Sequence, residues 1–243
     1  MAIKIVNLRK EYKDVVAVND LNLEIKDGEL FSLLGVNGAG KTTLIKMLAT
    51  LIKPTSGDAF IFGNSINSHE DKIKELIDIS MQETAIARKL TVEENIDFYA
   101  ELNGQSKDEI KETKEYIYKT FGLDQIKNKL AYKLSGGWQR KLSIALALIT
   151  KPKVLFLDEP TLGLDVIARR ELWKTIKSLK GKMTIILTTH YMEEAEELSD
   201  RIGIMKDGNL LFVGTKEDLY KETLKKNVEE AFVHIVSGGG LDE

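Results

Sequence analysis

The sequence predicts an α/β fold with a parallel sheet at its core, a strand-rich opening third and an all-helical insert. Three observations support this prediction. Buried strands alternate with helices in the last third of the chain, residues 91–120 show only helical spacing, and the first 62 residues contain several short strands. The 243 residues, 43% of them hydrophobic, suffice for one large domain or two small ones.

The opening third is rich in strands. Residues 3–6 and 21–25 alternate apolar and polar side chains, and the second run ends at an Asp-Gly turn. Residues 59–62 add a strand that ends at Gly63. Between these strands, residues 30–34 form an apolar run typical of a buried strand.

A glycine-rich loop follows the buried strand. Residues 35–42 read Gly-Val-Asn-Gly-Ala-Gly-Lys-Thr and match the phosphate-binding pattern Gly-x-x-x-x-Gly-Lys-[Ser/Thr]. Residues 43–51 then carry apolar side chains at helical spacing. A strand, a glycine loop and a helix in this order point backbone N–H groups and a helix N-terminus at an anion. The loop therefore predicts binding of a nucleoside triphosphate.

The residue types in the loop fit this chemistry. Gly38 and Gly40 allow a tight turn close to the phosphates, and Lys41 adds a charge for the outer phosphates. The Thr42 hydroxyl is placed to ligate Mg²⁺. Because the expected partner of Lys41 is a ligand phosphate, its removal is expected to have little effect on fold stability.

Residues 91–120 predict a helical insert. Residues 91–94 and 106–109 each form a capping box, the signature of a helix start. The expected apolar stripe of the first helix is Ile96, Phe98, Tyr99 and Leu102. The second helix is charged, with Ile110 and Ile117 on it.

The last third alternates strands with helices. We expect strands over 154–157 and 183–188, and helices over 169–179 and 192–198. Strands separated by helices of this length are typical of a parallel sheet.

Two carboxylates end the first of these strands. Asp158 and Glu159 would lie at the carboxyl edge of a central strand, where ligands bind in open α/β sheets. We expect Asp158 to hold Mg²⁺ and Glu159 to orient or deprotonate an attacking water. His190 follows the next strand at the same edge and is expected to contact the γ-phosphate. The alternative interpretation is an ordinary polar strand end.

A second helix start precedes the carboxylate strand. Ser135, Gly136 and Gly137 lead into a helix with apolar residues at 142, 144, 145 and 148. The free N–H groups and the hydroxyl suit an anion, although the same residues also occur as a simple loop and cap. The position upstream of Asp158 favours the anion-binding interpretation.

Composition excludes several classes of protein. The net charge of −3, with basic and acidic residues mixed along the chain, predicts no nucleic-acid partner. The absence of cysteine excludes disulfides and thiolate metal sites. The longest apolar run, residues 144–149, is far short of the ~20 residues that cross a bilayer, and the N-terminus does not resemble a signal peptide. The chain is expected to be soluble by itself, with any membrane role provided by a partner.

Together these motifs resemble the ATP-binding-cassette (ABC) ATPase family over nearly the whole chain. The resemblance implies a P-loop NTPase core with a parallel sheet, an N-terminal antiparallel β subdomain and an inserted α-helical subdomain. It implies a single domain, residues 1–243, divided into a nucleotide-binding core, a helical subdomain with the signature motif, and a C-terminal tail. The respective ranges are 1–84 with 151–222, about 85–150, and 223–243.

The resemblance also implies roles for residues that are unremarkable by themselves. Tyr12 matches the aromatic that stacks on adenine, and Gln82 the glutamine that senses magnesium. Asp165 lies in the loop that crosses the dimer interface, and His190 matches the switch histidine. The implied catalytic residues are Lys41, Glu159 and His190, and the implied metal ligands are Thr42, Gln82 and Asp158. The implied ATP contacts are Tyr12, Gly35, Asn37, Gly38, Ala39, Gly40, Lys41, Thr42, Thr43, Gln82, Ser135, Gly136, Gly137 and Asp165.

Two positions depart from the family pattern. Trp138 stands where the signature motif usually has glutamine, which follows here as Gln139. Leu162 stands where the interface loop usually has serine. Since Ser135 and the glycine amides supply the expected γ-phosphate contacts, we expect function to persist.

The implied function is ATP hydrolysis within a dimer. In this family the signature motif of one protomer completes the phosphate site of the other, and this chain has one copy of each motif. The expected partners are a second ABC ATPase protomer, identical or different, and separate transmembrane permease subunits at the inner face of the cell membrane. Residues 188–196 and 229–232 resemble the drug-export type. The alternatives are a soluble ABC ATPase in cofactor assembly, such as Fe–S assembly, and an ATP-gated regulatory module with little turnover.

Overall fold

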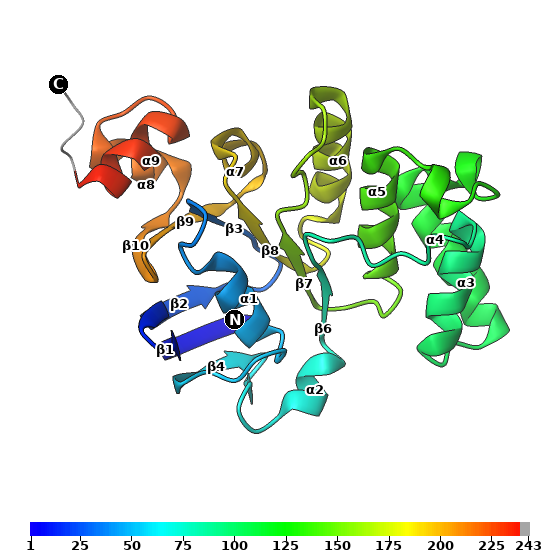
Figure 1. The fold of residues 1–243 in the computed structure, drawn as a ribbon, viewed down its shortest axis with the longest axis horizontal. Coiled ribbons are helices and arrows are strands. Elements are labelled where there is room, and N and C mark those ends of the chain that lie inside the picture. Colours follow the sequence, from blue (N-terminus) through cyan, green and yellow to red (C-terminus); the bar gives the residue numbers. More distant parts are fainter. Residues whose placement is uncertain (239–243) are drawn as a thin grey trace.

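The computed structural model describes residues 1–238 and contains two sheets (Figure 1). The larger sheet has six strands in the order β10-β9-β3-β8-β7-β6. Its strands are β3 (Leu30–Gly35), β6 (Ile77–Ser80), β7 (Val154–Asp158), β8 (Thr184–Thr189), β9 (Arg201–Lys206) and β10 (Asn209–Gly214). All neighbours pair in parallel except β10, which runs antiparallel to β9. The predicted parallel core is confirmed.

The smaller sheet is antiparallel and comes from the opening third, in the order β2-β1-β4-β5. Its strands are β1 (Ile3–Tyr12), β2 (Val15–Ile25), β4 (Ser56–Ile61) and β5 (Asn64–Ser65). Along residues 21–25, buried and exposed side chains alternate, as the sequence pattern predicts for a half-buried strand. The N-terminal antiparallel subdomain is confirmed.

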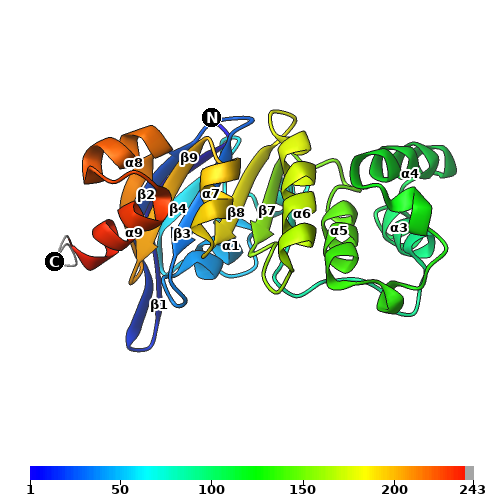
Figure 2. The same ribbon diagram turned by 90° about the horizontal axis from the view of Figure 1, so that it is seen from above.

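Helices cover both faces of the larger sheet (Figure 2). The helices outside the insert are α1 (Lys41–Leu48), α2 (Glu70–Lys74), α6 (Val166–Leu179), α7 (Met192–Leu198), α8 (Lys216–Thr223) and α9 (Val228–Ser237). Helix α1 packs in one apolar cluster with both sheets, and α6 and α7 lie side by side on the opposite face. Strand β3 is buried on both faces, which explains its continuous apolar run.

The helical insert forms one end of the molecule (Figure 1). Its helices are α3 (Val92–Leu102), α4 (Lys107–Phe121) and α5 (Gly136–Leu146), with short 3-10 turns at Leu123–Ile126 and Ala131–Lys133. Both predicted capping boxes are present, at Thr91 and Ser106.

The predicted apolar stripe of α3 is wrong in part. Ile96 is fully buried, but Phe98 and Leu102 are 48% and 70% exposed. The buried face is instead set by the i, i+4 series of residues 92, 96 and 100, and residues 98 and 102 fall outside it. Helix α1 also ends at Leu48, and Leu51, expected on its apolar face, is exposed.

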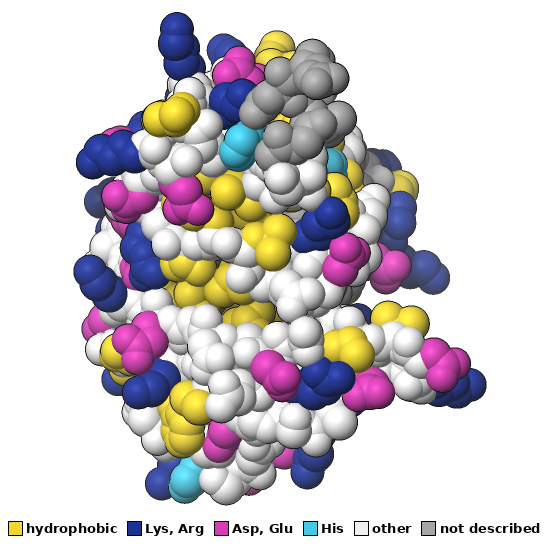
Figure 3. Space-filling view, turned by 90° about the vertical axis from the view of Figure 1, so that its left-hand side faces the viewer, with side chains coloured by type: hydrophobic (Ala, Val, Ile, Leu, Met, Phe, Trp, Pro, Cys, Tyr) yellow, Lys and Arg dark blue, Asp and Glu magenta, His cyan; other side chains and the backbone are white. Residues whose placement is uncertain are grey.

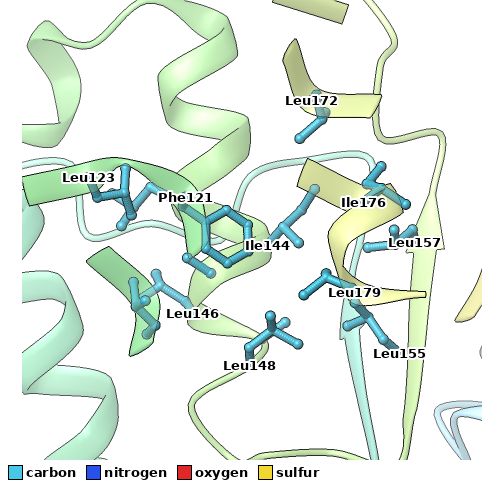
Figure 4. Packing of buried hydrophobic residues seen from close by; sticks show 14 of the residues in the cluster. Phe121, Leu123, Ile144, Leu146, Leu148, Leu155, Leu157, Leu172, Ile176 and Leu179 are labelled. Atoms are coloured by element: carbon cyan, nitrogen blue, oxygen red, sulfur yellow. The ribbon is translucent and has the colours of Figure 1, made fainter. Parts of the chain in front are cut away.

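One apolar cluster joins the insert to the sheet. Figure 4 shows Phe121 of α4 beside Ile144 of α5, with Leu155 of β7 beside Leu179 of α6 in the same cluster. Full burial of one such side chain contributes about 1.5–3 kcal/mol to stability. The N-terminus of α5 is thereby held in place relative to the strand that carries Asp158 and Glu159.

A third cluster occupies the other end, where α7 and α9 pack against β9 and β10. In α9, Ala231 and Phe232 are buried in it. The expected C-terminal tail, 223–243, is described to residue 238, and residues 239–243 lie outside the described residues. Figure 3 views this end face-on and shows apolar side chains gathered in its middle. Within residues 1–238, no helix has the length and apolar character that crossing a lipid bilayer requires.

Candidate nucleotide-binding site

The glycine loop between β3 and α1 lines a cavity of about 230 Å³. Residues 37–43 form most of its wall, with Gln82 and Glu159 on one side and Val15 and Ala17 of β2 on another. The cap residue of α1 is Gly40 at φ +103°, and it provides no side-chain cap. A Cβ there would come within 2.1 Å of the Ala17 carbonyl oxygen, so only glycine fits. The N–H groups of the first turn of α1 are therefore available to an anion.

Lys41 is buried in this loop. Its Nζ donates to the carbonyl oxygens of Gly35, at 2.7 Å, and Val36, at 3.2 Å, and lies 3.6 Å from Glu159 Oε1. Burial lowers the pKa of Lys41, and the nearby carboxylate of Glu159 acts in the opposite direction. The lysine thus has partners of its own in the protein, whereas the sequence suggested a ligand phosphate alone.

Thr42, which lines the cavity, contacts the buried carboxylate of Asp158 at the end of β7. The Thr42 hydroxyl lies 3.1 and 3.2 Å from the two carboxylate oxygens of Asp158, and Asp158 Oδ1 also accepts a hydrogen bond from the Thr188 hydroxyl at 2.5 Å. Hydroxyl and carboxylate oxygens are ligands that Mg²⁺ prefers. No cluster of three or more acidic or histidine side chains suited to a metal occurs in residues 1–238. The Thr42 hydroxyl and the Asp158 carboxylate fit a magnesium ion that would take its remaining oxygens from a nucleotide and water.

Glu159 sits at the end of β7 in a strained conformation. Its φ of +48° lies in the left-handed region, which costs about 1–3 kcal/mol for a residue other than glycine. Its N–H donates to the Thr188 carbonyl and hydroxyl oxygens, both at 3.1 Å. The carboxylate lies between Lys41 and His190, whose Nδ1 is 2.6 Å from Glu159 Oε2. This turn projects the side chain into the cavity, where it can meet a water molecule.

The structure brings together most of the predicted site and leaves part of it elsewhere. Tyr12 is 47% exposed at the end of β1 and does not line the phosphate-loop cavity. Ser135 and Gly137 line a separate small cavity together with Trp138. Asp165 caps α6 by accepting hydrogen bonds from the N–H groups of Ile167 and Ala168, both at 2.9 Å. The serine–glycine motif and the phosphate loop thus lie on different cavities of one chain.

Arg140 connects helix α5 to the strand end that carries Asp158 and Glu159, a role that the sequence motifs did not indicate. It is 4% exposed, and its guanidinium donates to the carbonyl oxygens of Asp158, Glu159, Pro160 and Met81 at 2.5–3.2 Å. Burial lowers its pKa to about 10. The only signal in the sequence was a pair of charged residues, Arg140 and Lys141, directly before the largely apolar run 142–149.

We expect Arg140→Met to destabilise the chain by about 3 kcal/mol or more, because four buried carbonyl oxygens lose a charged donor. Chemical denaturation measures the change in the free energy of unfolding. The matched control is Arg170→Met on α6, which is exposed and should change that free energy by no more than about 0.5 kcal/mol. Equal stability of the two variants would show that Arg140 does not hold the strand end.

Comparison with known proteins agrees with this geometry. Residues 18–162 match the family model described as "ABC transporter". The chain is 44% identical over 217 residues to human "Phospholipid-transporting ATPase ABCA3", covering 88% of this chain and 13% of that protein. It is 37% identical over 234 residues to the "Daunorubicin/doxorubicin resistance ATP-binding protein DrrA" of Streptomyces peucetius, covering 96% of this chain and 71% of DrrA.

Solved structures extend the similarity to the fold. One is titled "Dimeric structure of a post-hydrolysis state of the ATP-binding cassette MJ0796 bound to ADP and Pi". It superposes with a TM-score of 0.77 at 28% identity and covers 88% of this chain and 98% of that one. With the phosphate loop, the carboxylate strand and the family match in agreement, the chain belongs to the ABC transporter family.

Proposed function

We propose that the chain binds ATP and hydrolyses it to ADP and phosphate, as the ATP-binding subunit of a transporter, in a dimer with a second ABC ATPase protomer. The observation that carries this proposal is the separation of the two motifs. The phosphate loop lines one cavity and Ser135 lines another, so each chain offers two half-sites. The dimeric, ADP-bound cassette among the similar structures supports a dimer.

The surface around the serine–glycine motif has the character of an interface. Ser135 is exposed, and its hydroxyl makes no hydrogen bond that caps α5. Leu162, Val166 and Ile167 beside Asp165 are 37%, 59% and 74% exposed. Large apolar side chains grouped around a polar loop favour burial by a partner. The second protomer would cover this surface and present its own phosphate loop to Ser135.

In this proposal the loop amides of residues 37–43 bind the phosphates. Lys41 turns from Glu159 toward the β- and γ-phosphates, while Thr42, Asp158 and Gln82 hold magnesium, which neutralises phosphate charge when bound. Gln82 links this site to the helical subdomain, which we place at about residues 85–150 between core segments 1–84 and 151–222.

The hydrolytic step would use Glu159 and His190. Glu159 accepts a proton from water as the water oxygen attacks the γ-phosphorus. The bond between the γ-phosphorus and the oxygen that bridges it to the β-phosphate breaks in the same step. The 2.6 Å contact with His190 Nδ1 keeps the carboxylate in position for this transfer. The pair of Glu159 and His190 favours an ATPase with regular turnover over an ATP-gated regulatory module with little turnover.

The transport role rests on the named relatives. The chain spans 13% of the length of the human relative and 71% of DrrA. A role in transport therefore requires membrane subunits in addition to this chain. We propose export through separate membrane subunits, with the chain on their inner face. Co-purification with a multi-span membrane protein would support this proposal, and co-purification with a cofactor-assembly complex would contradict it.

The dimer is tested with Ser135→Arg. The variant should bind ATP as a monomer like the unchanged chain, because its own phosphate loop is intact. It should not dimerise with ATP, because the arginine side chain would occupy the γ-phosphate position of the partner. Size-exclusion elution with ATP and phosphate release measure the two effects. Normal dimerisation and turnover would mean that the motif is only a helix start.

A mixture supplies the matched control for this experiment. Ser135→Arg combined with Lys41→Ala leaves one intact composite site, made from the phosphate loop of the first chain and the signature of the second. The mixture should recover at most one active site per dimer, whereas neither variant alone should hydrolyse ATP.

A further inference from the structure

A buried polar cluster lies behind Glu159 and His190, with Glu194 of α7 at its centre. The Glu194 side chain is fully buried, and its Oε1 accepts a hydrogen bond from the indole N–H of Trp173 on α6 at 2.9 Å. Its Oε2 has no hydrogen-bond partner in the described part of the chain. A buried carboxylate oxygen without a partner destabilises a fold by about 1–3 kcal/mol or more. Such an atom is uncommon, because nearly all buried polar atoms in native proteins have a hydrogen-bond partner.

Two threonines flank this carboxyl group, one from the segment that follows Glu159 and one from the strand that ends directly before His190. Thr161 lies two residues after Glu159, Thr189 directly precedes His190, and both are 1% exposed. Burial raises the pKa of Glu194, and the hydroxyls of these threonines and the Trp173 N–H counteract it. Thr189 Oγ1 also accepts the N–H of Tyr191 at 2.9 Å. Glu194 therefore lies against both segments that carry the proposed hydrolytic pair.

Arg169 of α6 extends the cluster to His190. Its guanidinium lies 4.6 Å from the centre of the Tyr191 ring, and that ring lies 4.2 Å from the His190 ring. Its positive charge also acts on Glu194 and opposes part of the rise that burial causes in the pKa of that carboxyl. Arg169 Nε and Thr161 Oγ1 are buried without a hydrogen-bond partner among residues 1–238. An unpaired acceptor thus lies close to unpaired polar atoms of two other segments.

We propose that Glu194 is a positioning residue for the hydrolytic pair. It connects α6 and the Thr161 segment with the strand end at Thr189, and so sets the 2.6 Å contact between His190 Nδ1 and Glu159 Oε2. Glu194 does not line the phosphate-loop cavity, so its effect reaches ATP only through His190 and Glu159. The inference rests on the proposed ATP hydrolysis and assigns a role to a residue that is not among the predicted nucleotide, metal or catalytic residues. It follows that Glu194 affects the rate of hydrolysis and leaves nucleotide affinity unchanged.

Glu194→Gln tests the proposal without changing side-chain volume. The glutamine oxygen can still accept from Trp173, but its NH₂ group meets Arg169 and the threonine hydroxyls as a further donor. We expect kcat to fall about 10- to 100-fold, as small misplacements of reacting groups do. The dissociation constant of a non-hydrolysable ATP analogue should change less than about twofold. The matched control is Glu197→Gln, one turn along α7, where the side chain is 54% exposed and paired with Lys177.

A double-mutant cycle with His190→Ala separates positioning from a general structural role. If Glu194 acts through His190, Glu194→Gln should add little to the loss caused by His190→Ala alone. If the two losses in kcat multiply in the double variant, the residues act independently and the proposal is overturned. An unchanged kcat in Glu194→Gln would overturn it as well. If that variant does not fold, Trp173→Phe removes one hydrogen bond to Glu194 while retaining an aromatic ring. It should lower kcat without changing affinity, and an unchanged kcat would overturn the proposal equally.

The unchanged chain, assayed alongside, separates a failure of the proposed ATP hydrolysis from a failure of the proposed role of Glu194. No ATP hydrolysis by the unchanged chain would contradict the proposed function and this inference with it. Normal hydrolysis in both the unchanged chain and Glu194→Gln would overturn only the role of Glu194.

Discussion

Glu159→Gln is expected to bind ATP with unchanged affinity and to hydrolyse it about 10²–10⁴ times more slowly than the unchanged chain. Glutamine has nearly the same size and can keep the contact with His190, but it cannot accept a proton from water. Because binding and dimer closure precede the chemistry in the proposed cycle, the variant should accumulate as an ATP-bound dimer. Phosphate release measures turnover, and size-exclusion elution with ATP measures the dimer.

The matched control is Glu193→Gln, which removes the same charge from an exposed position on α7. It should hydrolyse ATP like the unchanged chain. Hydrolysis at the normal rate in Glu159→Gln would exclude Glu159 as the base. Slow hydrolysis without an ATP-dependent dimer would agree with Glu159 as the base. It would contradict the proposed order, in which dimer closure precedes hydrolysis.

Lys41→Ala is expected to abolish ATP binding at concentrations that saturate the unchanged chain. The lysine supplies the positive charge buried in the phosphate loop, and a bound phosphate has no other lysine or arginine among the residues that line this cavity. Nucleotide binding is measured directly, by calorimetry or a fluorescent ATP analogue. The control is Lys46→Ala, on the same helix but absent from the cavity lining, which should bind ATP normally.

The structure also changes the expected effect of Lys41→Ala on the stability of the fold. The lysine donates to the carbonyl oxygens of Gly35 and Val36 and pairs with Glu159, so its loss leaves buried groups unpaired. We expect the free energy of unfolding without ligand to fall by about 1–3 kcal/mol. Unchanged nucleotide affinity would refute the assignment of the loop. Complete unfolding without ligand would show that Lys41 is chiefly structural.

Much of the fold follows from short stretches of sequence. The capping boxes at Thr91 and Ser106 form as predicted because their partners lie three residues away. The buried strands over 30–35 and 154–158 were recognisable because both faces of a parallel strand are covered, which makes the run apolar. The phosphate loop likewise needs only its own glycines and the helix that follows.

Errors arose where burial depends on distant segments. Phe98 and Leu102 have the composition of an apolar stripe, yet the face of α3 that meets the insert's core runs through residues 92, 96 and 100. Strands β6, β9 and β10 were not predicted, because their place in the sheet depends on neighbours far along the chain. Periodicity within one helix or strand does not reveal which side the rest of the protein will cover.

The sequence alone determined the chemistry available to this protein: a phosphate loop, a pair of carboxylates, a histidine and a serine–glycine helix start. Only the tertiary structure decided how these groups work together. It placed Arg140 on the carbonyl oxygens behind Asp158 and Glu159, and it buried Glu194 behind the pair of Glu159 and His190. It also separated Ser135 from the phosphate loop of its own chain. The physical reason is that hydrogen bonds and burial form between residues that are close in space, and folding brings together residues far apart in sequence.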